Sequence, residues 1–229
     1  MAFNLWNLRK HFRKKKILVL GDSHAEIFDN PLISKKFCKY KLRNCSVPGA
    51  TVSGLSNPNS KTQALPLFEA AYKETRPDYT IFLLGEVDVG FVLWYRAEKY
   101  NISVRKLLYN TIENYQALVL STLGVEGTII ISAPLPTIKD NQSWGEVANA
   151  RKEIKKSQKE RTALTLEFNR IMSEWAFSQN IDFINLDTES LGTNGLVSEY
   201  LLNANQFDHH YDPDAYAQML REYLYKYLD

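Results

Sequence analysis

Short apolar runs, several of them followed by glycine or proline, recur along the chain and predict buried strands. The clearest runs are 17–20, 79–84, 128–132 and 181–186, and a weaker one covers 41–47. Runs of this length are typical of strands that are buried on both faces of a sheet. They therefore predict a parallel sheet in the interior of the protein.

Stretches with apolar residues at a spacing near 3.6 lie between these runs and predict helices. They cover 63–75, 103–123, 146–178 and 213–228. The last stretch begins at Pro213, and proline is favoured at the first helical position. Strand and helix thus alternate, which predicts an α/β fold with helices on both faces of the sheet. Such sheets carry their chemistry beyond the carboxyl ends of the strands.

Composition and charge divide the chain of 229 residues into two parts. Residues 1–16 contain six lysines and arginines and no acid, whereas the rest contains 22 basic and 26 acidic residues. We expect a basic N-terminal segment, residues 1–15, followed by one domain, residues 16–229. Because the body has no net basic charge, we expect no nucleic-acid partner. Apolar side chains in the segment predict either weak contact with a membrane surface or a solvated leader.

The location of the protein is predicted from what the sequence lacks. No apolar run approaches the ~20 residues of a membrane span, and no secretory signal pattern is found. The two cysteines, Cys38 and Cys45, are too few for a disulfide framework or a four-thiolate zinc site. We therefore expect reduced thiols in a cytoplasmic protein.

Gly21-Asp22-Ser23-His24 directly follows the first apolar run, where an α/β sheet places its chemistry. A serine hydroxyl becomes a good nucleophile when a base removes its proton. Backbone N–H groups at the start of the next helix can bind an oxyanion. The alternative is an ordinary turn from strand to helix in which the serine caps the helix.

Asp208-His209-His210 near the C-terminus is the second candidate. Imidazole is the usual general base near neutral pH, and a neighbouring carboxylate can orient it. Three of the four histidines in the chain lie in these two motifs. The alternative is a surface loop with a histidine pair before the last helix.

Four motifs in this order resemble the SGNH (GDSL-like) hydrolase superfamily. They are Gly21-Asp22-Ser23-His24, Ser46-Val47-Pro48-Gly49-Ala50-Thr51, Gly85-Glu86-Val87-Asp88, and the segment from His210 to Tyr216. The resemblance covers most of residues 16–220. It implies a flavodoxin-like three-layer sandwich with a central parallel sheet of about five strands.

The resemblance also implies roles for individual residues. Ser23 would be the nucleophile, His210 the general base, and Asp208 the residue that orients the imidazole. The N–H groups of Ser23 and Gly49 would bind the oxyanion.

Two positions depart from the family pattern. The third motif of the family reads Gly-x-Asn-Asp, and Val87 stands where the asparagine donates to the oxyanion. An ionised Glu86 cannot replace that donor. In addition, the aspartate usually precedes the histidine by three residues, whereas Asp208 precedes His210 by two. His209 is therefore kept as an alternative base.

Other residues beside these motifs are candidates for lining the site. They are Asp22, His24, Glu86, Asp88, His209 and Trp94. Trp94 belongs to an aromatic and charged segment, residues 89–100, that predicts either a sugar-binding surface or a packed helix entry. Trp144 and the charged stretch up to Arg161 predict either a lid or, more simply, a solvated helix.

Four hypotheses follow. The first is a serine esterase or deacetylase that acts on a small O-acyl ester, such as an acetylated carbohydrate, and needs no cofactor or metal. The second is an O-acyltransferase that uses the same serine and histidine to modify a surface polysaccharide. The third is a metal-dependent phosphoesterase with ligands among the histidines and aspartates of these motifs. The fourth is a non-catalytic member that binds a glycan or another partner.

Overall fold

The computed structural model describes residues 13–122, 127–140 and 156–228, and a parallel sheet of five strands lies at its centre. The strand order is β2-β1-β3-β4-β5, and every neighbouring pair is parallel. The bounds are β1 Lys16–Gly21, β2 Lys41–Ser46, β3 Tyr79–Leu83, β4 Thr128–Ile131 and β5 Asp182–Ile184. All five predicted strands, and the flavodoxin-like sandwich, are confirmed.

The helices between the strands follow the predicted order. The long ones are α3 Ala64–Thr75, α5 Val104–Ser121, α7 Gln158–Ser178 and α9 Pro213–Leu228. Shorter ones that the periodicity did not predict are α2 Pro31–Ser34, α4 Leu93–Tyr100 and α8 Asp187–Ser190, with 3₁₀ turns η1 Ser23–Asp29, η2 Val52–Gly54 and η4 Glu199–Leu201 and a π-helical turn η3 Asp88–Val92.

Helix α7 begins later than the predicted start at residue 146. Ser157 caps it, and a reciprocal pair of hydrogen bonds between Ser157 and Glu160 forms a capping box. This start lies at Gln158, while residues 141–155, which include Trp144, are outside the described residues.

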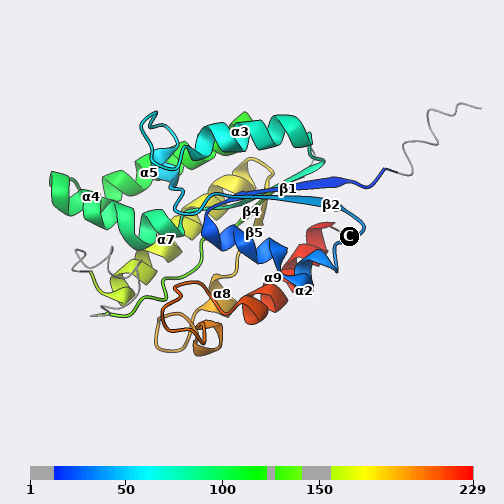
Figure 1. Ribbon diagram of the computed structural model, residues 1–229. Helices are drawn as coiled ribbons and strands as arrows, with labels where there is room; N and C mark the ends of the chain where they lie inside the picture. The colour runs from blue at the N-terminus through cyan, green and yellow to red at the C-terminus, as the bar shows by residue number, and fades with distance from the viewer. Residues whose placement is uncertain (1–12, 123–126, 141–155, 229) are drawn as a thin grey trace, which may run out of the picture.

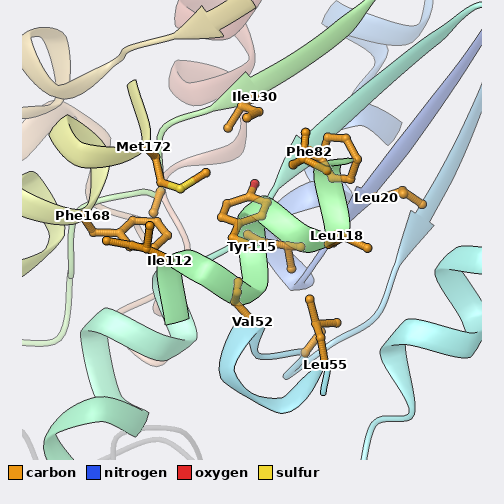
Figure 2. Close-up of a cluster of buried hydrophobic side chains, with 14 of the residues drawn as sticks. Leu20, Val52, Leu55, Phe82, Ile112, Tyr115, Leu118, Ile130, Phe168 and Met172 are labelled. Atoms are coloured by element: carbon orange, nitrogen blue, oxygen red, sulfur yellow. The ribbon is translucent and has the colours of Figure 1, made fainter. Parts of the chain in front are cut away.

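Helices cover both faces of the sheet (Figure 1), and side chains that alternate along the strands contribute to a separate core on each face. Leu18 and Leu20 of β1 face the core that is covered by α3, α5 and α7. Ile17 and Val19 face the other core, which is covered by η1, α2 and α9. Figure 2 shows the first core, in which Tyr115 of α5 lies among aromatic and aliphatic side chains from the sheet, α7 and the 52–55 turn.

The carboxyl end of β1 is the position in this fold where a functional site is expected. The chain leaves β1 for β2 on one side and later returns as β3 on the other, so the end of β1 lies at a topological switch point. Gly21 is required there, because a Cβ atom would lie 2.5 Å from the carbonyl oxygen of Leu83. The residues that follow Gly21 therefore emerge at the carboxyl edge of the sheet.

The described part of the basic segment contacts the domain. Arg13 forms an ion pair with Asp78 at 2.6 Å, and Lys14 donates to the carbonyl oxygen of Cys38. Residues 1–12 lie outside the described residues, so the division at residue 15 stays a prediction. Both cysteines are free thiols. No helix in the described ranges is long and apolar enough to cross a membrane.

Candidate active site

Ser23 is the first residue of turn η1, directly beyond the carboxyl end of β1. The N-cap of this turn is Asp22, whose carboxylate accepts a hydrogen bond from the N–H of His24 at 2.9 Å. The interpretation of Ser23 as a simple helix cap is therefore wrong. Because Asp22 caps the turn, the hydroxyl of Ser23 is available for another partner.

That partner is His210, which lies 187 positions further along the chain. Ser23 Oγ lies 2.8 Å from His210 Nε2, and His210 Nδ1 lies 2.6 Å from Asp208 Oδ1. These lengths are within hydrogen-bond range, and together they form a serine–histidine–aspartate chain. The structure therefore brings together the three residues for which catalytic roles were predicted.

The short spacing between Asp208 and His210 is explained by a local turn. Asp208 Oδ1 accepts from the backbone N–H of His210 at 2.9 Å as well as from its ring. One carboxylate oxygen thus fixes both the main chain and the imidazole of the same residue. Two residues of separation are enough for this geometry, so the departure from the three-residue spacing does not prevent the pair from forming.

Asp208 stays ionised in this arrangement. Burial alone would raise the pKa of its carboxyl group, but the hydrogen bonds from the backbone and ring of His210 outweigh that effect and hold the pKa below its usual value. An ionised carboxylate at this position fixes the imidazole with its proton on Nδ1 and leaves Nε2 to face Ser23. It also stabilises the imidazolium that would form after proton transfer.

A second aspartate–histidine pair faces the first. His24 Nδ1 lies 3.1 Å from Asp22 Oδ1, and both side chains are buried. The ring centroid of His24 is 4.7 Å from that of His210 and 5.8 Å from that of His209. The sequence predicted these residues as site-lining but gave no sign that their rings would meet.

The loop after β4 supports the histidine segment. The N–H of Leu135 donates to the hydroxyl of Tyr211 at 2.6 Å, and the hydroxyl of Thr137 donates to the carbonyl oxygen of His209 at 2.5 Å. Arg161 of α7 donates in turn to the carbonyl oxygen of Ile138. Arg161 is buried, so the prediction of a solvated helix is wrong at this position.

Asp88, which was expected to line the site, instead stabilises the turn at Val52 and Ser53. Its fully buried carboxylate accepts from the N–H groups of Val52 at 2.7 Å and Ser53 at 3.0 Å. Burial raises its pKa to about 6, although these hydrogen bonds oppose the shift. Asp88 thus holds the turn that follows Gly49, whose backbone has a positive φ of 73°. Val87 offers no side-chain donor to an oxyanion.

A pocket of about 280 Å³ opens beside Ser23. Of the predicted residues, Ser23, His24, Asp208 and His210 line it. Its lining does not include Asp22, Gly49, Glu86, Asp88, His209 or Trp94. His209 instead lines an adjoining pocket of about 140 Å³ that shares Asp208.

Sequence reasoning missed the polar residues that complete the main pocket. They are Glu26, Asn30 and Asn203. Glu26 and Asn30 lie within seven residues of Ser23, so their proximity was a usable signal. Asn203 precedes the histidine motif by several residues and carried no comparable signal.

Trp94 packs inside the aromatic segment rather than in the pocket. Its indole N–H donates to the carbonyl oxygen of Val89 at 2.8 Å, and the ring packs against the core under α5 and α7. Phe91 and Tyr95 stack on each other, with ring centroids 6.0 Å apart. These contacts favour the packed helix entry over a sugar-binding surface.

The described residues offer one cluster with metal-ligating geometry. His24, His209 and His210 each present a ring nitrogen, and these atoms lie within 4.8 Å of one another. Asp88, which the phosphoesterase hypothesis included, is instead hydrogen-bonded to the turn after Gly49.

Comparisons with known proteins agree with this architecture. No protein-family model and no curated protein sequence matches the chain. Among solved structures, a GDSL-like lipase from Bacteroides thetaiotaomicron is 16% identical, with a TM-score of 0.61, and the match covers 97% of this chain and 96% of that one. The chain has an SGNH hydrolase-like fold.

Two further structures with this fold have names that specify a substrate. A catalytic mutant of an acetylxylan esterase from Geobacillus stearothermophilus is 16% identical, with a TM-score of 0.59 and 93% coverage of both chains. A carbohydrate acetylesterase from Sinorhizobium meliloti is 12% identical, with a TM-score of 0.59 and coverage of 93% of this chain and 98% of that one. At these identities the likeness establishes the SGNH hydrolase-like fold, and the roles of individual residues rest on their geometry.

Proposed function

We propose that the protein is a serine-dependent ester hydrolase. The observation that carries this proposal is the hydrogen-bonded chain from Ser23 through His210 to Asp208, all three of which line a pocket. A serine hydroxyl that donates to a carboxylate-oriented imidazole is the arrangement that activates a serine nucleophile.

Each proton transfer is proposed at a named atom. Ser23 Oγ attacks the acyl carbonyl while His210 Nε2 accepts its proton. The imidazolium then gives that proton to the leaving alkoxide, which leaves an acyl group on Ser23. A water molecule that loses its proton to Nε2 releases the acid and restores the serine.

Two backbone N–H groups, those of Ser23 and Gly49, are proposed to bind the developing oxyanion. Val87 replaces the side-chain donor that the family motif provides at this position. The loss of one such donor costs about 10²–10³ in rate. We therefore expect slower ester hydrolysis than in an enzyme that keeps this donor. We also expect the position of the Gly49 N–H to depend on the carboxylate of Asp88, which holds the turn that follows.

An acetylated carbohydrate is the proposed substrate. The names of two neighbours support this class, since one is an acetylxylan esterase and one a carbohydrate acetylesterase. The pocket beside Ser23 combines polar side chains, Asn30 and Asn203, with the apolar Ile27. Such a lining suits a small acyl group beside sugar hydroxyls. The comparisons give the acyltransferase alternative no support.

The first test is reaction with a fluorophosphonate probe, followed by intact-mass analysis. We expect one adduct on the unmodified chain and none on Ser23→Ala. Ser178→Ala is the matched control, because its exposed hydroxyl caps a backbone carbonyl of Trp175 at the far end of α7. Absence of an adduct on the folded unmodified chain would contradict the proposal and favour the non-catalytic alternative.

The second test addresses the substrate. Acetate release from acetylated xylo-oligosaccharides is compared with release of longer acyl groups from the same sugars. We expect acetate to be released faster because the pocket is small. Equal or faster release of long acyl chains would contradict the proposed substrate class while leaving the serine mechanism in place.

A further inference from the structure

The three histidines around Ser23 form a cluster that the esterase mechanism does not explain. Hydrolysis uses one imidazole, that of His210, yet the rings of His24 and His209 lie 4.7 Å and 4.1 Å from it between centroids. We propose that His24, His209 and His210 form an inhibitory site for a divalent transition-metal ion such as zinc. The inhibitory part of this proposal rests on the proposed function, whereas the metal site itself does not.

The spacing of the ring nitrogens is close to that of a metal site. Zinc–nitrogen bonds of about 2.0–2.1 Å in a tetrahedron place the ligand nitrogens about 3.3 Å apart. The three nitrogens here lie within 4.8 Å of one another, so rotation of the rings has to close about 1.5 Å at most. Three protein ligands would leave a fourth position for water, and imidazole is a preferred ligand of zinc, copper and nickel.

Carboxylates already orient two of the three histidines. Asp22 Oδ1 lies 3.1 Å from His24 Nδ1, and Asp208 Oδ1 lies 2.6 Å from His210 Nδ1. Metal-ligating histidines almost always donate their second ring N–H to such a partner, which fixes the tautomer and raises the basicity of the ligand nitrogen. Both pairs thus direct Nε2 away from the carboxylate. Two carboxyl groups behind the rings also favour a cation between them.

Metal binding and catalysis would compete for the same electron pair. The lone pair of His210 Nε2 accepts the hydrogen bond from Ser23 Oγ at 2.8 Å. A metal ion bound at Nε2 occupies that lone pair, so the imidazole can no longer accept the serine proton. No bond is broken and no redox change occurs, and removal of the ion restores the base. The cluster therefore acts as a reversible block on the nucleophile.

The site is tested first by titration with Co²⁺, whose visible absorption reports the ligand set. The chain is freed of metal with a chelator and exchanged into chelator-free buffer. We expect one Co²⁺ per chain, with visible bands of low-coordinate cobalt and without the near-ultraviolet bands of cobalt–thiolate bonds. Cys38 and Cys45 would produce those thiolate bands, so their appearance would overturn the assignment.

Single variants identify the ligands. His209→Gln is the main variant, because His209 is only half-buried, and His24→Gln is the second. Each is expected to raise the Kd for Co²⁺ at least tenfold, as is loss of the positioning carboxylate in Asp22→Asn, for which about 10–100-fold is typical. His11→Gln, which removes the fourth histidine of the chain, is the control and should bind as the unmodified chain does. Equal affinity in all variants, or no saturable binding up to millimolar Co²⁺, would overturn the site.

Inhibition is tested separately with the fluorophosphonate probe. We expect Zn²⁺ to slow labelling of Ser23 at least tenfold and a chelator to restore it, with a higher Zn²⁺ concentration needed for His209→Gln. If Co²⁺ binds but Zn²⁺ leaves the rate of labelling unchanged or raises it, the inhibitory role is overturned and the metal site stands. If the metal-free chain is not labelled at all, the ester-hydrolase proposal fails and the inhibitory role fails with it, while the Co²⁺ titration still decides the metal site.

Discussion

The chain builds the same local unit twice, once at Asp22-Ser23-His24 and once at Asp208-His209-His210. In both, one aspartate oxygen accepts from the histidine N–H two residues later, at 2.9 Å, and from the Nδ1 of the same histidine. Both units follow an Asp-x-His spacing, and the two histidine rings lie close together, with centroids 4.7 Å apart and a tilt of 55°. Local sequence is therefore sufficient to make an aspartate–histidine pair.

The surroundings give the two units different properties. The side chain of His24 is 3% exposed, whereas that of His210 is 31% exposed and contacts Ser23. Asp22 also caps turn η1, so one carboxylate serves both the turn and the ring. In the second unit Asp208 likewise accepts from the N–H and the ring of His210, and a separate residue, Asp212, accepts from the N–H of Ala215 at the start of α9. Access to the pocket, rather than the pair itself, distinguishes the proposed base.

Replacement of each histidine should separate the two units most strongly. His210→Gln removes the proposed general base, and we expect acetate release to fall about 10²–10⁴-fold. His24→Gln should lower it only about tenfold, through displacement of the His210 ring that packs against it. The measurement is kcat/KM on an acetylated sugar, in buffer with a chelator. Comparable losses in the two variants would show that the buried pair shares in proton transfer.

Replacement of each aspartate should shift the effect from activity to stability. Asp208→Asn is expected to lower kcat by up to about 10⁴-fold, because an amide can favour the wrong tautomer of His210. Asp22→Asn should instead lower the free energy of unfolding by about 1–3 kcal/mol, because it leaves a buried polar group without its proper partner. Urea denaturation and kcat are measured on both variants. A stability loss confined to Asp208→Asn would contradict this division.

The sheet was predictable because its signal is local. Each strand is a short apolar run, and the end of β1 is marked by Gly21, where a Cβ atom has no space. The order of the four motifs then indicated Ser23, Asp208 and His210. The role of turn η3 was harder to predict from the sequence, because Asp88 binds N–H groups of the distant turn at Val52.

Contacts between distant segments explain what the sequence did not predict. The meeting of the His24 and His210 rings depends on how turn η1 and α9 are packed, and no periodicity in the sequence predicts that packing. The same holds for Asn203. It lines the same pocket as Asn30 but lies far from Asn30 in the sequence. The burial of Arg161 was not predicted, because its neighbours in the sequence are charged.

Loss of the residue that caps α9, Asp212, should leave the chemistry of the second unit nearly intact. Asp212→Ala removes the acceptor for the N–H of Ala215 at 2.9 Å, and we expect a loss of about 0.5–2 kcal/mol in the free energy of unfolding. Because Asp208 still holds His210, kcat should change by less than about threefold, a shift well under 1 kcal/mol. Thermal denaturation and acetate release are measured together. A large fall in kcat with unchanged stability would show that the cap positions the base.

The smallest expected effect is a difference in pH dependence between Asp208 and a half-buried acid, Asp187, that supports its unit. Asp187 accepts from Asn169 at 2.7 Å, and Asn169 holds both backbone groups of Ala133 at the start of the loop that contacts Tyr211. Burial raises the pKa of Asp187 to about 6. The folded state then binds more protons than the unfolded state between about pH 4 and 6, so its contribution to stability falls as pH rises through this window.

Asp187→Asn, which keeps an acceptor for Asn169 but cannot ionise, should remove that slope. We expect the free energy of unfolding of the unmodified chain to fall relative to the variant by about 2 kcal/mol or less from pH 4 to pH 7. Asp208→Asn is the contrasting variant. Because the pKa of Asp208 is lowered, its ionised carboxylate stabilises the fold at pH values above the usual aspartate pKa, and this stabilisation is lost only as pH falls below that range. The difference in free energy of unfolding between the unmodified chain and Asp208→Asn should therefore stay flat over the same interval. Urea denaturation at pH 4, 5, 6 and 7 gives both curves, and parallel curves for the unmodified chain and Asp187→Asn would contradict the raised pKa of Asp187.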